Sequence, residues 1–145
     1  MELINRIIHA LTVLHPLHPM FVHFPIALTG SAFLFVLIAA WKNSASIEQT
    51  AFANMILASI STIVAGITGY LDNLKNYDGK APNASVKITL AITLFLLTAG
   101  ISLIRYRNPE IFMKGNRTMY VISYGLCFAI ALVLAFLGGI ILYGF

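Results

Sequence analysis

Charged residues are scarce in this chain. Only 10% of its 145 residues are Asp, Glu, Lys or Arg, while 59% are hydrophobic and the mean hydropathy is +0.89. A soluble domain of this size needs a charged surface and does not tolerate such a balance. The composition therefore excludes an ordinary soluble domain and predicts an integral membrane protein.

Cysteine is nearly absent, and Cys127 is the one cysteine of the chain. It cannot form a disulfide within the chain, and its position in an apolar run predicts a small buried side chain. The net charge of +4 is modest, and the basic residues lie beside apolar segments. We interpret them as topology signals and lipid-headgroup contacts, and we expect no nucleic-acid binding.

Motifs of enzyme chemistry are also missing. The sequence has no HExxH, no nucleophile elbow with Ser, His and Asp in order, no glycine-rich phosphate loop and no pair of membrane-buried carboxylates. We therefore expect no catalytic residues and no enzyme activity. A small-solute transporter is the third hypothesis for function, since no ionisable residue is expected near the middle of a spanning segment.

Long apolar segments dominate what is present. A helix needs about 20 predominantly apolar residues to span a bilayer, and each of four segments approaches or exceeds that length. We expect transmembrane helices over residues 20–41, 51–71, 86–104 and 119–143, in a single membrane domain over residues 1–145. The predicted fold class is all-α, an integral membrane four-helix bundle in which every charge lies outside the apolar runs, with Lys87 snorkelling at the start of the third span.

An N-terminal amphipathic helix is predicted over residues 2–14. Apolar residues recur there at helical spacing, and polar ones cover the opposite face. The apolar residues are Leu3, Ile4, Ile7, Ile8, Leu11 and Leu14. We expect this amphipathic helix to lie in the membrane interface. The segment lacks the basic start and the cleavage site of a secretory signal, so we do not interpret it as one.

Three connections follow from these spans. Residues 42–50 form a short one, residues 72–87 read as a loop of turns, and residues 105–118 carry the densest cluster of basic residues. The positive-inside rule places the basic connection in the cytoplasm. Both termini and the histidine-rich end of the bundle are then expected on the outer side.

Small residues predict how two of the helices pack. Ala58, Thr62, Gly66 and Gly69 are expected to form one close-packing stripe, and residues 131, 135 and 139 form another. Such stripes let helix backbones approach closely in lipid.

The segment "HPLHPMFVHFPIAL", residues 15–28, holds three of the four histidines at the start of the first span. Pro19 suits the first turn of a helix. Pro25 then lies inside the helix and frees the carbonyl of Phe21, or the regular helix begins only near Pro25. Because an unpaired histidine at membrane depth is costly, His23 is expected to face the bundle or water.

Topology gathers several polar residues at this end, and two interpretations of them stay open. In one, they form a structural polar cap in which His15 and His18 are solvated and His23 satisfies carbonyls released by Pro25. The cap comprises His15, His18, His23, Pro25, Tyr70 and Asp72, with Tyr143 and Lys87 at the same level. In the other, His23 ligates haem b together with His15, His18, Lys87 or a residue of another subunit. We expect no metal site, because no thiolate or carboxylate triad lies near these histidines.

Three stretches resemble a family of small bacterial four-helix membrane proteins, the domain of unknown function 2231 family. "HPMFVHFPIAL" (18–28) is similar to the family's specific opening of the first helix. "GITGYLDNL" (66–74) and "FLGGIILYGF" (136–145) are similar to its glycine-containing helix ends. Relatives commonly carry a histidine near the start of the third helix, where this chain has Lys87, so the resemblance does not imply a bis-histidine haem site within one chain.

The resemblance implies a respiratory or electron-transfer setting in a bacterial inner membrane, because relatives occur beside or fused to electron-carrying domains. We expect a non-catalytic subunit that packs within or anchors a larger electron-transfer or energy-conversion complex. Its expected partners are other membrane subunits and lipid, with quinone or pigment as further candidates. The alternative is a haem b-binding electron carrier that uses His23.

Overall fold

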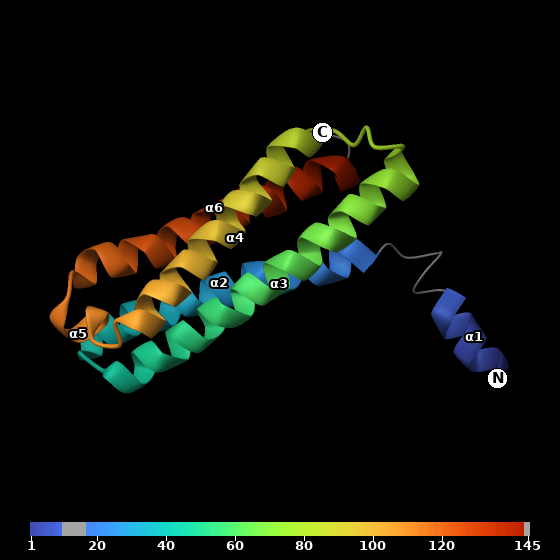
Figure 1. Ribbon diagram of the computed structural model, residues 1–145. Coiled ribbons are helices and arrows are strands. Elements are labelled where there is room, and N and C mark those ends of the chain that lie inside the picture. Colours follow the sequence, from blue (N-terminus) through green and yellow to red (C-terminus); the bar gives the residue numbers. More distant parts are fainter. Residues whose placement is uncertain (10–16, 144–145) are drawn as a thin grey trace.

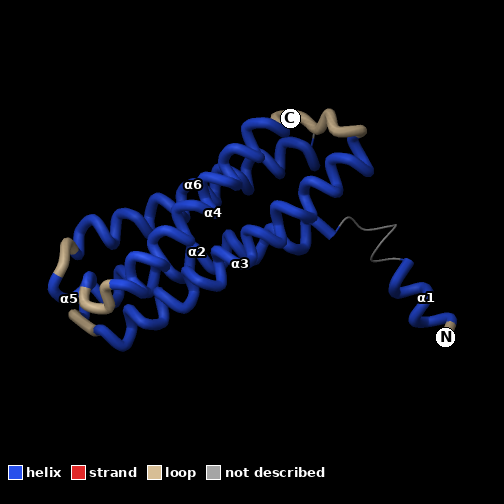
Figure 2. The backbone as a smooth tube through the Cα atoms, in the orientation of Figure 1, coloured by secondary structure: helices blue, strands red, loops and turns tan. Residues whose placement is uncertain are grey.

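The computed structural model describes residues 1–9 and 17–143, and helices make up nearly all of this part of the chain (Figure 1). No strand occurs among the residues described (Figure 2). The helices are α1 (Glu2–His9), α2 (Leu17–Lys42), α3 (Ala45–Tyr77), α4 (Ala84–Arg107), α5 (Ile111–Lys114) and α6 (Arg117–Tyr143).

Four of these helices are long and apolar enough to cross a membrane, namely α2, α3, α4 and α6. They run up and down in sequence order. α2 packs most extensively against α3, and α4 and α6 complete a ring in which α4 contacts α3 and α6 contacts α2. The prediction of an all-α, four-span membrane bundle is confirmed.

The spanning helices are longer than the apolar segments that predict them. α3 begins at Ala45, where Ser44 caps the helix by accepting a hydrogen bond from the backbone N–H of Ile47. It continues to Tyr77 and ends at Asp78 and Gly79, which both have positive φ. The predicted connections 42–50 and 72–87 are therefore too long, because a cap and a left-handed turn end the helices where hydropathy does not.

α2 is continuous through the proline-rich entrance. Pro19 is its third residue, where a backbone N–H has no partner within the helix anyway. Pro25 lies inside the helix and is buried, so the first of the two alternatives for this segment is the one observed. The hydroxyl of Thr29 donates to the Pro25 carbonyl at 2.6 Å.

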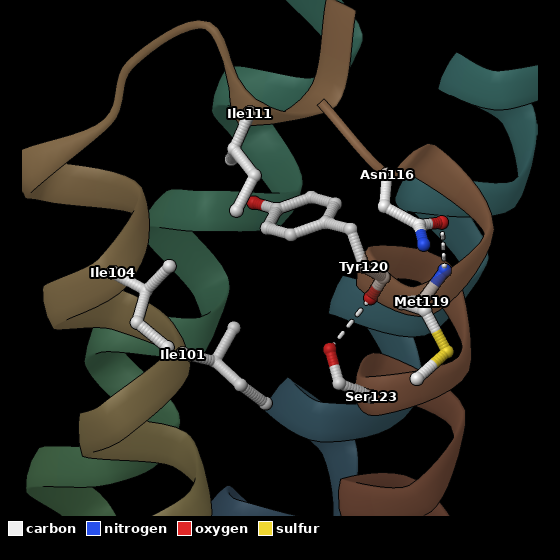
Figure 3. Close-up of a pocket in the computed structure, with 7 residues that line it drawn as sticks. All are labelled: Ile101, Ile104, Ile111, Asn116, Met119, Tyr120 and Ser123. Carbon is white, nitrogen blue, oxygen red and sulfur yellow. Dashed lines mark hydrogen bonds between the residues drawn. The ribbon is translucent and has the colours of Figure 1, made fainter. Parts of the chain in front are cut away.

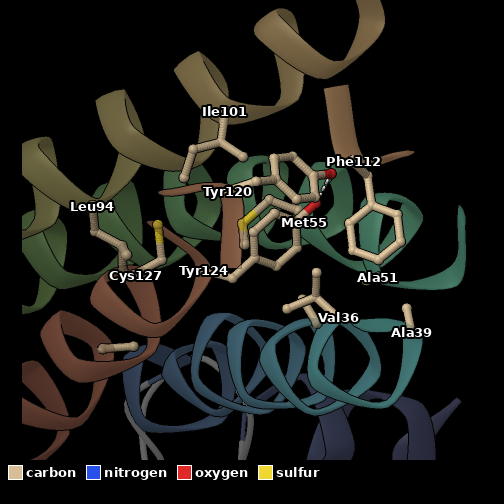
Figure 4. Packing of buried hydrophobic residues seen from close by; sticks show 12 residues of the cluster. Val36, Ala39, Ala51, Met55, Leu94, Ile101, Phe112, Tyr120, Tyr124 and Cys127 are labelled. Atoms are coloured by element: carbon tan, nitrogen blue, oxygen red, sulfur yellow. Dashed lines mark hydrogen bonds between the residues drawn. The ribbon is translucent and has the colours of Figure 1, made fainter. Parts of the chain in front are cut away.

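The core of the bundle lies towards the end that carries α5 (Figure 4). Val36 of α2, Met55 of α3 and Leu94 of α4 meet there with Tyr124 and Cys127 of α6, all fully buried or nearly so. The burial of Cys127 agrees with its prediction as a small hydrophobic side chain. This end therefore holds the bundle together.

The opposite end is open. No residue is buried in 17–24 of α2, 66–77 of α3, 84–93 of α4 or 132–140 of α6. In Figures 1 and 2 the α4 and α6 pair diverges from the α2 and α3 pair toward this end. We call these four stretches the open end.

α1 covers the first part of the predicted N-terminal helix, and residues 10–14 of that prediction lie outside the described residues. Its apolar residues Leu3, Ile4, Ile7 and Ile8 are all exposed, and Arg6 pairs with Glu2 at 3.3 Å. The helix lies apart from the bundle in Figure 1. Its location at a membrane interface stays a prediction.

Candidate functional site

A charged network is buried at the packed end, and we call Glu48, Arg105, Tyr120 and Tyr124 the buried network. Their exposed fractions are 1%, 8%, 5% and 0%, so all four side chains are shielded from the surroundings of the bundle. Glu48 comes from α3, Arg105 from α4 and the tyrosines from α6. The network therefore ties three of the four spanning helices together.

The ion pair at its centre is bidentate. Arg105 Nε donates to Glu48 Oε1 at 2.7 Å, and Arg105 Nη2 donates to Oε2 at 2.7 Å. This fork geometry is the strongest arrangement open to an arginine and a carboxylate. The guanidinium also lies over the ring of Phe52, 5.2 Å from its centroid.

The two tyrosines extend the network in a defined order. Tyr120 Oη donates to Glu48 Oε1 at 2.6 Å and lies 2.8 Å from Tyr124 Oη. A phenol has one proton, and Tyr120 gives its proton to the carboxylate. Tyr124 is therefore the donor in the tyrosine pair, and the chain of hydrogen bonds runs from Tyr124 through Tyr120 to Glu48.

Helix ends explain why these charges can be buried here. Glu48 lies in the first turn of α3 and Arg105 in the last turn of α4. A helix dipole favours an acid at the first turn and a base at the last. Among the described residues, no buried side-chain N or O atom lacks a hydrogen-bond partner. The pair is thus satisfied in full, which is what makes a buried charge tolerable.

This network was missed by sequence reasoning, which assigned Glu48 and Arg105 to the connections outside the apolar segments. The available signal was the Ser44 cap, since a helix that starts at Ala45 puts Glu48 one turn inside the bundle. Arg105 directly follows an apolar run, so hydropathy alone cannot tell whether it faces water or the interior.

A groove of about 220 Å³ lies beside the buried network, between α4, α5 and α6 (Figure 3). We call it the α5 groove. It is lined by Ile101, Ile104, Ile111, Asn116, Met119, Tyr120 and Ser123. Tyr120 thus has its ring on the groove wall while its hydroxyl is engaged with Glu48. The surface of the groove is mostly apolar, with polar atoms from α6.

The predicted histidine site lies at the other end, and His18 is its most constrained member. The ring Nδ1 lies 3.1 Å from the Ala65 carbonyl and 3.4 Å from Thr68 Oγ1, both on α3. A methyl group on Gly69 would come within 2.7 Å of His18 Cε1. His18 is therefore docked on α3 over a glycine, and the expectation that it is a solvated loop residue is wrong.

His23 points the other way. It is exposed on α2, and its Nδ1 is hydrogen-bonded to the carbonyl of Pro19 on the same helix. The expectation that it satisfies the Phe21 carbonyl freed by Pro25 is wrong, because the ring reaches back one turn along its own helix. His18 and His23 are five residues apart on one helix, which puts them on different faces.

The remaining members of the predicted cap come together only in part. Asp72 and Lys87 both lie within electrostatic range of His18, and Asp72 accepts a hydrogen bond from Asn76. Tyr70 is exposed at 57%. His15 and the side chain of Tyr143 lie outside the part of the chain that the structure describes.

Haem fits the described residues of a single chain poorly. His18 is held on α3 through its ring nitrogen, and His23 faces outward, so the two imidazoles cannot share one iron. Lys87 lies within electrostatic range of His18. Among the described residues, no group of three His, Cys, Asp or Glu could hold a metal ion.

Comparison with known proteins identifies the family. The model of predicted membrane proteins called DUF2231 matches residues 14–145, which is nearly the whole chain. No curated protein and no solved structure matches this chain. The matched span runs from the histidine-rich entrance through all four spanning helices, including both the open end and the buried network. The chain therefore belongs to the DUF2231 family of predicted membrane proteins.

Proposed function

We propose that this chain is a non-catalytic subunit that packs within, or anchors, a larger membrane complex of electron transfer or energy conversion. The observation that carries the proposal is the open end, where one stretch of each of the four spanning helices has no buried residue. The electron-transfer setting rests on the family resemblance, and the assembly role rests on the open end itself.

The surfaces at the open end suit other helices better than lipid tails. Ser85, Thr89 and their apolar neighbours line a pocket of about 270 Å³ on α4. A methyl group added to Gly66, Gly138 or Gly139 would meet nothing within 4 Å. Small and hydroxylated residues drive helix association in membranes, since they allow close approach and interhelical hydrogen bonds.

Site-specific photo-crosslinking tests the proposal. A photoreactive residue replaces Leu90, which lines the pocket on α4, and as a matched control it replaces Leu103, exposed near the other end of the same helix. In native membranes, position 90 is expected to crosslink to a membrane chain that also co-purifies at a fixed ratio. Crosslinks from position 90 to lipid alone would contradict an assembly role for the open end.

A second candidate, haem b binding through His23, is favoured by one contact. The Pro19 carbonyl engages His23 Nδ1, and the exposed ring leaves Nε2 available. A backbone carbonyl on the far nitrogen is the usual orienting contact of a ligating imidazole. The second ligand would come from another chain. A reduced-minus-oxidised spectrum with sharp α and β bands, lost in His23→Ala and kept in His18→Ala, would support it.

For location, we propose a bacterial inner membrane with the α5 end in the cytoplasm. The densest cluster of basic residues in the chain lies at that end, namely Arg105, Arg107, Lys114 and Arg117. Cytoplasmic connections carry such an excess. The test places a cysteine at Thr118. Labelling of this cysteine in opened cells but not in intact cells would support this orientation.

A further inference from the structure

The α5 groove combines an apolar wall with an uncompensated positive rim. Ile101 and Ile104 of α4, Ile111 of α5 and Met119 of α6 form the wall (Figure 3). Met119 and Ile104 are 63% and 54% exposed, so the wall faces outward from the bundle. In a membrane protein this outward face is lipid-accessible.

The rim lies where the spanning helices end. Arg107 is the last residue of α4 and follows Ile104 by one turn, while Arg117 begins α6. Neither pairs with an acid among the described residues: Arg117 donates instead to the Phe112 carbonyl and to Asn43 Oδ1. Glu110 is exposed but is paired with Lys114 at 2.8 Å. Glu48 is buried and neutralised by Arg105, so it does not oppose an anion.

Asn116 supplies a neutral donor at the same level. Its Oδ1 accepts the backbone N–H of Met119 at 3.2 Å, which fixes the side chain at the start of α6. The amide Nδ2 has no partner in the described part of the chain. Arg107 lies one turn beyond the groove residue Ile104 on α4, and Asn116 directly precedes α6, so a phosphate at this level would lie between a cation and an amide above an apolar groove.

We propose that the α5 groove binds one anionic phospholipid. An acyl chain occupies the wall of Ile101, Ile104, Ile111 and Met119, and the phosphate lies between Arg107 and Asn116. A zwitterionic lipid offers the same chain but no net charge, so the positive rim selects against it. Each basic residue near a membrane surface contributes about fivefold to the binding of anionic lipid.

Native mass spectrometry of the purified wild-type chain tests the preference without any substitution. The protein is reconstituted with phosphatidylglycerol or with phosphatidylcholine and released into a mild detergent. We expect one phosphatidylglycerol to be retained per chain, against little phosphatidylcholine. Equal retention of the two lipids, or retention of neither, would overturn the proposal. A helix of a partner chain would then be the candidate occupant of the groove.

Matched variants locate the site. Ile104→Trp fills the groove and is expected to abolish retention, whereas Leu103→Trp adds the same bulk to the neighbouring exposed position and keeps it. Arg107→Gln is expected to lower phosphatidylglycerol retention about fivefold. Lys80→Gln, at the other end of the bundle, leaves it unchanged. Equal losses in Ile104→Trp and Leu103→Trp would place the lipid elsewhere.

Discussion

Glu48 and Arg105, separated by 57 positions in sequence, meet in a bidentate ion pair at the packed end of the bundle. Both side chains are almost fully buried, and a tyrosine hydroxyl from a third helix completes the shell of the carboxylate. The pair therefore fixes α3, α4 and α6 in a single register.

Removal of one partner is predicted to be far more harmful than removal of both. Glu48→Ala leaves the Arg105 guanidinium buried without a counter-charge, which costs about 3–5 kcal/mol of stability. Glu48→Met combined with Arg105→Leu replaces the pair by apolar groups of similar volume and is expected to lie near wild type. Thermal unfolding in one detergent measures all three proteins. A double variant as unstable as Glu48→Ala would contradict this account.

The tyrosines are predicted to contribute unequally. Tyr120→Phe removes a hydrogen bond to a charged carboxylate, worth about 1.5–3 kcal/mol, whereas Tyr124→Phe removes a neutral one, worth about 1 kcal/mol. Unfolding of the two variants gives the order directly. In the Glu48→Met, Arg105→Leu background the excess cost of Tyr120→Phe should disappear, and its persistence would mean that Tyr120 acts through packing alone.

Much of the bundle follows from hydropathy, but the network does not. Four spans can be read from the sequence because about 20 apolar residues in a row have few other uses. The ends of α3 and α4 depend instead on caps and turns. A few residues added to those helices move Glu48 and Arg105 from expected connections into the interior. Their pairing then depends on tertiary packing that no local pattern encodes.

The histidine motif illustrates the same limit. Its location at the entrance of α2 is evident from the sequence, but which imidazole faces α3 depends on where the helix begins. Since α2 already starts at Leu17, His18 docks on α3 and His23 turns outward. The predicted small-residue stripe on α3 holds at Ala58 and Thr62, which are buried, and at Gly69, which lies under His18, whereas Gly66 faces open space and Ala65 is buried instead.

Two glycines one turn apart on α3 are predicted to respond in opposite directions. Gly69→Ala forces a methyl group against the His18 ring, and overpacking of this kind costs about 1–3 kcal/mol. Gly66→Ala meets no neighbour and is expected to stabilise the helix by about 0.5–1 kcal/mol. Thermal unfolding in detergent measures both variants.

A second substitution tests the cause of the Gly69 effect. If the clash with His18 is responsible, His18→Ala should restore most of the stability that Gly69→Ala loses. A loss of equal size in the His18→Ala background would instead assign the effect to the backbone of α3.

The most direct test of the account is the composition of the particle that contains this chain when it is purified gently from its native membrane. Intact mass measurement is predicted to find the wild-type chain bound to other membrane chains at a fixed ratio. Thr89→Trp blocks the open end, so the variant chain is predicted to purify without these partners. A chain that purifies alone, with the same mass in wild type and Thr89→Trp, would contradict its role as an assembly subunit.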